Sequence, residues 1–210
     1  KKREVELLKK HDQEYVYKEL MSPLVNYVLP SIEPAKQLLS KTKPITINGF
    51  TFQTLKSSNL TYHGPDNDAI YIYDSKSYRE GIMVRELKPE ELANRHKINS
   101  KLIQHFIMYK PYSDYKPIQY ATVWNDATPA MYMEVDRSTS RMYILSLYDD
   151  KYLYTHFIMA NSDYETPAKD LRDIIQYVDN ANDADKYSRS LPGMAAIPKD
   201  MFDMDFIKTR

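Results

Sequence analysis

Four short runs of alternating apolar and polar residues follow one another between residues 117 and 160, and they constrain the fold more than any other feature. They read PIQYATVW, AMYMEVD, RMYILSLYDD and KYLYTHFIMA, with polar turns at Asp136 to Ser140 and at Asp149-Asp150. A period of two is typical of strands, since successive side chains of a strand point to opposite faces of the sheet. Short strands spaced by about 10 residues and joined by polar turns predict an antiparallel meander.

A further group of strands is predicted between Pro44 and Leu87. In ITINGFTFQTL, Asn48 and Gly49 stand between β-branched and aromatic residues. Both central residues of a type I′ turn need a positive φ, so Asn-Gly in this setting is the strongest short-range hairpin signal. The turn cluster HGPDND at 63–68 and the runs AIYIYD and GIMVREL then complete three or four short strands.

Two helices are predicted, one at 89–109 and one at 165–178. Pro89 suits a first helical position, and apolar residues then recur at helical spacing at Ile98, Leu102, Phe106 and Tyr109. The second helix has a capping-box pair at Ser162 and Glu165 and an alternative start at Thr166-Pro167. Its apolar stripe consists of Ala168, Leu171, Ile174, Ile175 and Val178.

These patterns predict an α+β fold, with a single antiparallel sheet, the two helices packed on it, and an N-terminal helical extension. A doubly wound βαβ fold is disfavoured because the strands come in runs and the helices are few. We expect three parts: a helical extension at 1–43, the α+β domain at 44–178, and a loop-like tail at 179–210.

Charge and composition exclude several classes of protein. The 29 basic residues balance the 29 acidic ones, so the chain lacks the positive charge of a protein that neutralises many phosphates. Without cysteine it has no disulfide, thiolate nucleophile or zinc–thiolate site, and no apolar stretch approaches the roughly 20 residues of a membrane helix. Because the chain begins at Lys1, the sequence leaves open whether an export signal or lipid anchor was removed upstream. We expect a secreted or cell-envelope location, with the cytoplasm as the alternative.

Sequence motifs for metals, phosphates and nucleophiles are missing. The five histidines show no H-x-x-x-H or H-x-H spacing, and DNANDAD at 179–185 lacks the glycine and closing glutamate of a calcium loop. The four glycines are scattered singly, so no P-loop, dinucleotide-binding turn or G-x-S-x-G elbow can be formed. We predict no metal and no cofactor.

His156 and the tyrosines around it are the candidate site residues. On an ideal strand His156 shares a face with Tyr152 and Tyr154, while Leu153, Thr155, Phe157 and Met159 take the other, more apolar face, which we expect to be the core face. The histidine is either a base or ligand in a pocket or, as we favour, a half-buried residue bonded to a tyrosine or carbonyl. Tyrosine suits interfaces because it combines an apolar ring with a polar tip. Among the 19 tyrosines and their neighbours, the predicted binding residues are Tyr152, Tyr154, His156, Tyr143 and Tyr132.

Four stretches of the chain resemble the PsbP-like superfamily, named for an extrinsic subunit of the photosynthetic oxygen-evolving complex. They are GFTFQTL, GPDNDAIYIY, ATPAMYMEV and YLYTHFIMANSDYETPAKDLRDIIQYV. The resemblance covers residues 45–178 and implies that superfamily's fold. Its members serve as assembly factors, extrinsic subunits or envelope proteins, so the fold alone does not supply a function.

The sequence therefore predicts a non-catalytic binding or assembly module that uses a tyrosine-rich sheet face. Its partner would be a protein, peptide or glycan. A hydrolase or other enzyme with a loop-built site is one alternative, and a structural subunit of a larger complex is another. An exposed, tyrosine-lined sheet face would favour the module, whereas convergent His, Asp or Glu side chains in a deep cleft would favour the enzyme.

Overall fold

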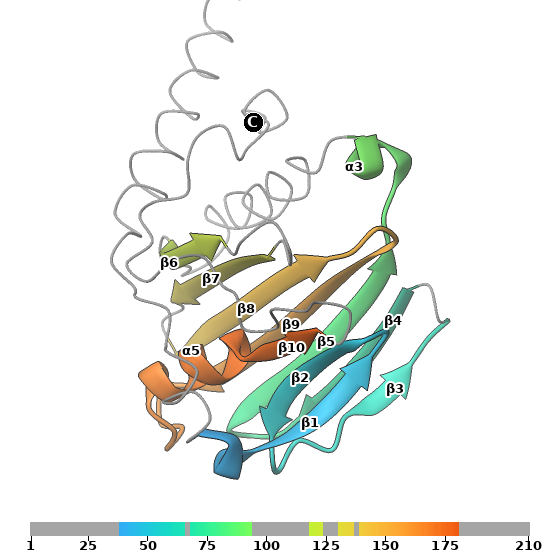
Figure 1. The fold of residues 1–210 in the computed structure, drawn as a ribbon. Helices are drawn as coiled ribbons and strands as arrows, with labels where there is room; N and C mark the ends of the chain where they lie inside the picture. Colours follow the sequence, from blue (N-terminus) through green and yellow to red (C-terminus); the bar gives the residue numbers. More distant parts are fainter. Residues whose placement is uncertain (1–37, 66–67, 94–117, 124–129, 137–138, 181–210) are drawn as a thin grey trace, which may run out of the picture.

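The described part of the protein is a β structure of two antiparallel sheets with few helices (Figure 1). The computed structural model describes residues 38–65, 68–93, 118–123, 130–136 and 139–180. The elements in these ranges are η2 (Leu38–Lys41), β1 (Thr42–Ile47), β2 (Phe50–Leu55), β3 (Thr61–His63), β4 (Asp68–Asp74), β5 (Tyr78–Glu86), α3 (Pro89–Ala93), β6 (Ile118–Val123), β7 (Ala130–Asp136), β8 (Ser140–Tyr148), β9 (Tyr152–Asn161), α5 (Ala168–Gln176) and β10 (Val178–Asn180).

The predicted single sheet is wrong, because the β1–β2 hairpin does not join the other strands. It pairs with β10 in a small sheet of order β1-β2-β10, while seven strands form a large sheet of order β3-β4-β5-β9-β8-β7-β6. The small sheet and α5 lie in front of the large sheet in Figure 1, and α5 contacts β2, β8 and β9. Two antiparallel sheets thus replace the predicted sheet with packed helices. Local turn signals predict hairpins, but they do not say which hairpins share a sheet.

The second predicted helix is shorter than expected, and the first is described only in part. The second begins at Ala168, behind Pro167 and without a side-chain cap, and ends at Gln176, so Val178 lies in a strand that pairs with Phe52. The described part of the first spans Pro89–Ala93, and its predicted remainder at 94–109 lies outside the described residues. Of the predicted N-terminal extension, η2 and the start of β1 at Thr42 are described, whereas 1–37 and 181–210 lie outside. The division into extension, domain and tail stays a prediction.

The Asn48-Gly49 hairpin is confirmed. The two residues have φ angles of 48° and 90°, and Ile47 pairs with Phe50 across the turn. Both positive φ angles match a type I′ turn, whose twist suits the flanking strands. The predicted run from β6 to β9 is also confirmed as a meander, since each of these strands pairs with the next.

The core lies between the two sheets, and α5 closes it at one end. Its fully buried side chains come from both sheets and the helix: Phe52, Ile82, Leu145, Tyr154, Ile158 and Ile175. Strand β9 therefore turns Tyr154, His156, Ile158 and Ala160 inward, while Thr155, Phe157 and Met159 are only half-buried on the other side. The predicted core face of this strand is wrong. Hydropathy misjudged it because the hydroxyl and imidazole groups of the inward face are hydrogen-bonded inside the protein.

We predict that Gly49→Ala lowers the free energy of unfolding by about 1–2 kcal/mol, because an L side chain is strained at this φ of 90°. The matched change Asn48→Gly introduces no strain, since glycine adopts positive φ readily, and should cost only the hydrogen bond of the Asn48 side chain to Tyr154, about 0.5–1 kcal/mol. Urea denaturation of both variants checks this. Equal stability of Gly49→Ala and the unmodified protein would contradict the assigned turn.

Candidate functional site

The five predicted binding residues lie together on one face of the large sheet, and that face is the core face. Tyr132, Tyr143, Tyr154 and His156 are buried, and Tyr152 is half-buried. Strand register brings them together, because Leu145 pairs with both Tyr132 and His156. A binding role for them stays a prediction, and in the folded protein only Tyr152 among them presents appreciable surface to a partner.

His156 is paired with a buried glutamate. Its Nε2 lies 2.7 Å from Oε2 of Glu80, and both side chains are inaccessible to solvent. The second carboxylate oxygen of Glu80 accepts the backbone N–H of Leu55 at 3.0 Å. The Phe52 ring stands edge-on to the imidazole, at 5.8 Å between centroids. Leu55 and Phe52 belong to the small sheet, so this pair ties the two sheets together.

The second nitrogen of His156 explains why the ring is no accessible base. Its Nδ1 is buried and has no hydrogen-bond partner. The other ring nitrogen, Nε2, is hydrogen-bonded to the Glu80 carboxyl group. Both ring nitrogens therefore lie inside the core, whereas a general base must reach its substrate proton directly or through one water.

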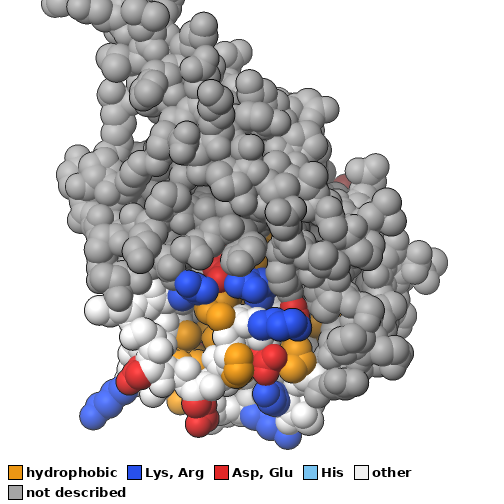
Figure 2. All heavy atoms as spheres, turned by 90° about the vertical axis from the view of Figure 1, so that its left-hand side faces the viewer, with side chains coloured by type: hydrophobic (Ala, Val, Ile, Leu, Met, Phe, Trp, Pro, Cys, Tyr) orange, Lys and Arg blue, Asp and Glu red, His pale blue; other side chains and the backbone are white. Residues whose placement is uncertain are grey.

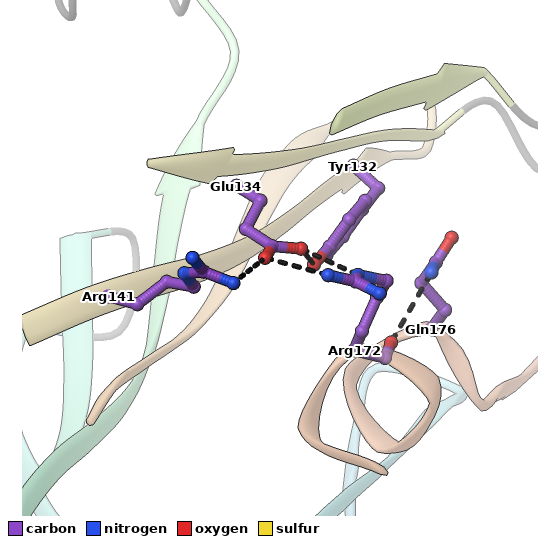
Figure 3. A network of polar contacts seen from close by, with 5 residues as sticks. All are labelled: Tyr132, Glu134, Arg141, Arg172 and Gln176. Carbon is purple, nitrogen blue, oxygen red and sulfur yellow. Dashed lines mark hydrogen bonds and ion pairs between the residues drawn. The ribbon is translucent and has the colours of Figure 1, made fainter. Parts of the chain in front are cut away.

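Glu134 on β7 is the centre of a second buried network (Figure 3). Arg172 on α5 binds it through two donors, Nε to Oε2 at 2.6 Å and Nη2 to Oε1 at 2.8 Å. Arg141 on β8 adds a bond of 3.1 Å to Oε1, and the Tyr132 hydroxyl donates to Oε2 at 2.8 Å. The Gln176 amide donates to the backbone oxygen of Arg172. One carboxylate thereby holds α5 against two strands.

This network also sets the protonation of the neighbouring tyrosines. Burial, and then the negative charge of Glu134, raise the pKa of the Tyr132 hydroxyl well above its ordinary value. The same two causes raise the pKa of Tyr143 to about 12. Both hydroxyls therefore stay protonated at neutral pH, and Tyr132 acts as a hydrogen-bond donor to Glu134 rather than as a nucleophile.

Neither network is arranged for catalysis or for metal binding. Each carboxylate is occupied by donors from other elements of the fold, and a general acid or base must contact its substrate. Within the described ranges, no group of three or more His, Cys, Asp or Glu side chains could hold a metal ion. Both networks read best as internal clamps.

We call the face of the large sheet that is turned away from the small sheet the outer face. Its side chains differ from the buried tyrosines of the core face. On β4 and β5, side chains of this face alternate with core residues, and Met83 at its centre is 42% exposed. Four cross-strand pairs cover these two strands: Asp74 with Arg79, Ile72 with Gly81, Ile70 with Met83, and Asp68 with Arg85. The apolar centre is thus flanked by an acidic and a basic residue at each end.

Strand β9 continues the apolar centre. Phe157 pairs with Gly81, and a Cβ built on Gly81 would lie 2.7 Å from two ring atoms of Phe157. The ring therefore covers the glycine and leans from β9 across β5. Ile70, Ile72, Phe157 and Met159 are half-buried, so this apolar area remains partly open to solvent. The sequence pattern did not predict this area, because the more apolar face of the strand, with Phe157 and Met159, was expected to be the core face.

Comparisons with known proteins are limited to the fold. No family model matches the chain, and no curated protein does. The solution structure of cyanobacterial PsbP (CyanoP) from Synechocystis sp. PCC 6803 is 11% identical, with a TM-score of 0.48, over 64% of this chain and 89% of that one. A protein of unknown function from Pseudomonas aeruginosa, PA94, described as a putative regulator, is 4% identical with a TM-score of 0.33, over 58% and 83%. The predicted PsbP-like resemblance is confirmed as a weak structural resemblance, and neither likeness bears on function.

Arg172→Met should lower the free energy of unfolding by about 3–5 kcal/mol, because it leaves the buried Glu134 carboxylate without its two-donor partner. The control Arg141→Met should cost about 1 kcal/mol, since this side chain is 30% exposed and its removal leaves the Arg172 bonds in place. Denaturant titration of the two variants measures the difference. Equal costs would contradict the clamp assigned to Arg172.

Stability should fall as the pH rises above 10.0, because the unfolded chain releases the Tyr143 proton near this ordinary value while the folded protein holds it up to about 12. The contribution is fully present below pH 10.0 and is lost as the pH rises towards about 12. The change Tyr143→Phe removes this contribution because phenylalanine has no hydroxyl to titrate. The fall in unfolding free energy over that range, measured by denaturation at a series of pH values, should therefore be shallower in the variant, and an unchanged slope would contradict this prediction.

Proposed function

We propose that this chain is a non-catalytic binding or assembly module whose contact surface is the outer face of the large sheet. The observation that carries the proposal is Met83, 42% exposed in the middle of an apolar area with charged residues at both ends. Protein interfaces combine an apolar centre with a polar rim in this way. Methionine adapts its flexible side chain to an apolar partner.

A protein partner suits this surface better than a glycan. Its apolar centre consists of Ile70, Ile72, Met83, Phe157 and Met159, and Phe157 supplies its only aromatic ring among the described residues of β4, β5 and β9. The tyrosines that would stack on sugars lie on the core face, where Tyr132, Tyr143 and Tyr154 are buried. Aliphatic and thioether side chains contribute contact area through burial of apolar surface.

The enzyme alternative lacks support from the described side chains. His156 and Glu80 bind each other in the core, and Glu134 is held by Arg172 and Arg141. Groups held in this way stabilise the fold, and a catalytic pair would have to reach a substrate.

Surface charge is mixed on the side of the molecule where α5 lies. Figure 2 shows Lys and Arg side chains beside Asp and Glu side chains there, with apolar side chains between them. The ion pairs Lys41–Asp170 and Lys169–Asp173 belong to η2 and α5. Interspersed charges of both signs support a protein partner over a nucleic acid, which would require a basic surface. No helix within the described ranges is long and apolar enough to cross a membrane.

A secreted or cell-envelope location is also part of the proposal.

Replacement of Met83 by the photoreactive residue p-benzoylphenylalanine, in cells of the source organism, tests this function. We expect irradiation to produce a discrete protein adduct at position 83, because the side chain would lie inside the contact. Leu92 is the matched control position. It is 46% exposed, but it lies on α3 and outside the four cross-strand pairs.

Adducts are detected by gel mobility and identified by mass spectrometry. An adduct at position 83 and none at position 92 supports the module, whether the second protein is a different chain or another copy of this one. Absence of any adduct at position 83, or equal adducts at both positions, contradicts the proposed surface.

A further inference from the structure

We propose that the outer face binds a second copy of this chain, through β4 and β5, with a two-fold axis parallel to the strands. This inference rests on the proposed function and names the partner. It follows from how charges and apolar groups are distributed over the two strands. On β4 the outer side chains run acidic, apolar, apolar, acidic, at Asp68, Ile70, Ile72 and Asp74. On β5 they run basic, apolar, small, basic, at Arg85, Met83, Gly81 and Arg79.

A two-fold axis between β4 and β5, parallel to both, makes this pattern complementary to itself. The rotation places β4 of one copy over β5 of the other and leaves each residue at the same height along the strands. Asp74 then faces Arg79 of the second copy, and Ile70 faces its Met83. An interface formed by a two-fold axis is self-complementary in this way, since each contact occurs twice.

The other in-plane axis, perpendicular to the strands, gives the opposite result. It would place β4 over β4 and β5 over β5 and bring Asp74 over Asp68 and Arg79 over Arg85. Like charges facing each other at an interface are unfavourable. Charge complementarity therefore selects a single axis.

The rim charges at one end of the apolar centre are exposed, whereas Arg85 at the other end is partly engaged within the chain. Arg79 and Asp74 are 44% and 56% exposed, and they lie 2.7 Å apart in a cross-strand ion pair. At the other end Arg85 forms an ion pair with Glu91 on α3 and interacts electrostatically with Asp68. A partner with charge of one sign would oppose half of these residues, whereas a second copy matches all of them. The balance of 29 basic and 29 acidic residues over the whole chain also removes long-range repulsion between copies.

The sheets can also approach closely. Two sheets pack face to face at about 10 Å with their strands nearly aligned. Gly81 has no side chain, and the Phe157 ring fills the space above it, so Ile72 of the second copy would meet an aromatic surface instead of a hole. Strands β3, β4, β5 and β9 span only about 14 Å across at roughly 4.8 Å spacing. This footprint is at the low end for a specific interface, so we expect a dissociation constant in the micromolar range.

The test uses two charge reversals, Asp74→Arg and Arg79→Asp, in the full chain. Each variant alone has like charges facing each other across the two-fold axis, and we expect its self-association to weaken at least tenfold. In an equimolar mixture, the new positive charge at position 74 of one variant faces the new negative charge at position 79 of the other. Heterodimers should therefore form with affinity close to that of the unmodified protein. Mixing cannot restore the ion pair within either chain, so recovery reports only the contact between copies.

Sedimentation velocity between about 1 and 500 μM, a range that spans the micromolar constant expected for so small an interface, measures association of the unmodified chain, each variant and the mixture. Met83→Lys should abolish association and Leu92→Lys should leave it unchanged. Thermal melting of each variant confirms that it is folded.

Three results overturn the inference: an unmodified chain that stays monomeric, variants that associate as well as it does, or a mixture that does not recover. Failure of the proposed function is distinguishable from these results. A monomeric chain that still crosslinks to a different protein at position 83 overturns self-association alone, whereas absence of any adduct there removes the proposed surface as well.

Discussion

The arrangement of the two sheets depends on how the buried carboxylate of Glu80 is satisfied. Burying an ionised group costs several kcal/mol unless it is paired and hydrogen-bonded. One oxygen of Glu80 accepts the Leu55 N–H of the small sheet, and the other is hydrogen-bonded to His156, which like Glu80 belongs to the large sheet. A shift of one sheet over the other would break one of these bonds. The bond between Leu55 and Glu80 therefore helps to fix the relative position of the sheets, and His156 holds the Glu80 side chain in place for it.

Glu134 connects the helix α5 to the large sheet in a similar way. Its bonds to Arg172 and Arg141 join α5 to the β7–β8 end of the large sheet, at a distance from the Glu80 pair along the strand order β5-β9-β8-β7. Two carboxylates thus connect the small sheet, the large sheet and α5. Because both carboxylates are hydrogen-bonded in this way, these two described side chains serve the fold. The outer face, where apolar groups are exposed and charged groups form a rim, is the surface that we propose for function.

How far the sequence could predict the fold is clear from particular elements. The Asn48-Gly49 turn and the β6–β9 meander were predictable because both depend on residues close in sequence: positive φ at two positions, and alternation between polar turns. The place of β10 was not predictable in the same way. Val178 continues the apolar stripe of the second helix, yet it pairs with Phe52, which lies far earlier in the chain. The candidate site shows the same contrast. The sequence predicted that Tyr152, Tyr154 and His156 share one face of β9, but it did not predict that this face is buried.

The sequence by itself determined the strand pattern, the turn and the grouping of side chains on each strand face, because a strand alternates its side chains whatever surrounds it. Only the tertiary structure decided which face of β9 is inside. That choice depends on hydrogen-bond partners that the fold supplies: Glu80 on β5 for the imidazole of His156, and Asp149 in the preceding turn for the hydroxyl of Tyr154. These hydrogen bonds offset much of the cost of burial, although Nδ1 of His156 has no partner, and the face with the tyrosines and the histidine became the core. The more apolar face, with Phe157 and Met159, was left partly exposed because the small sheet and α5 cover the opposite side.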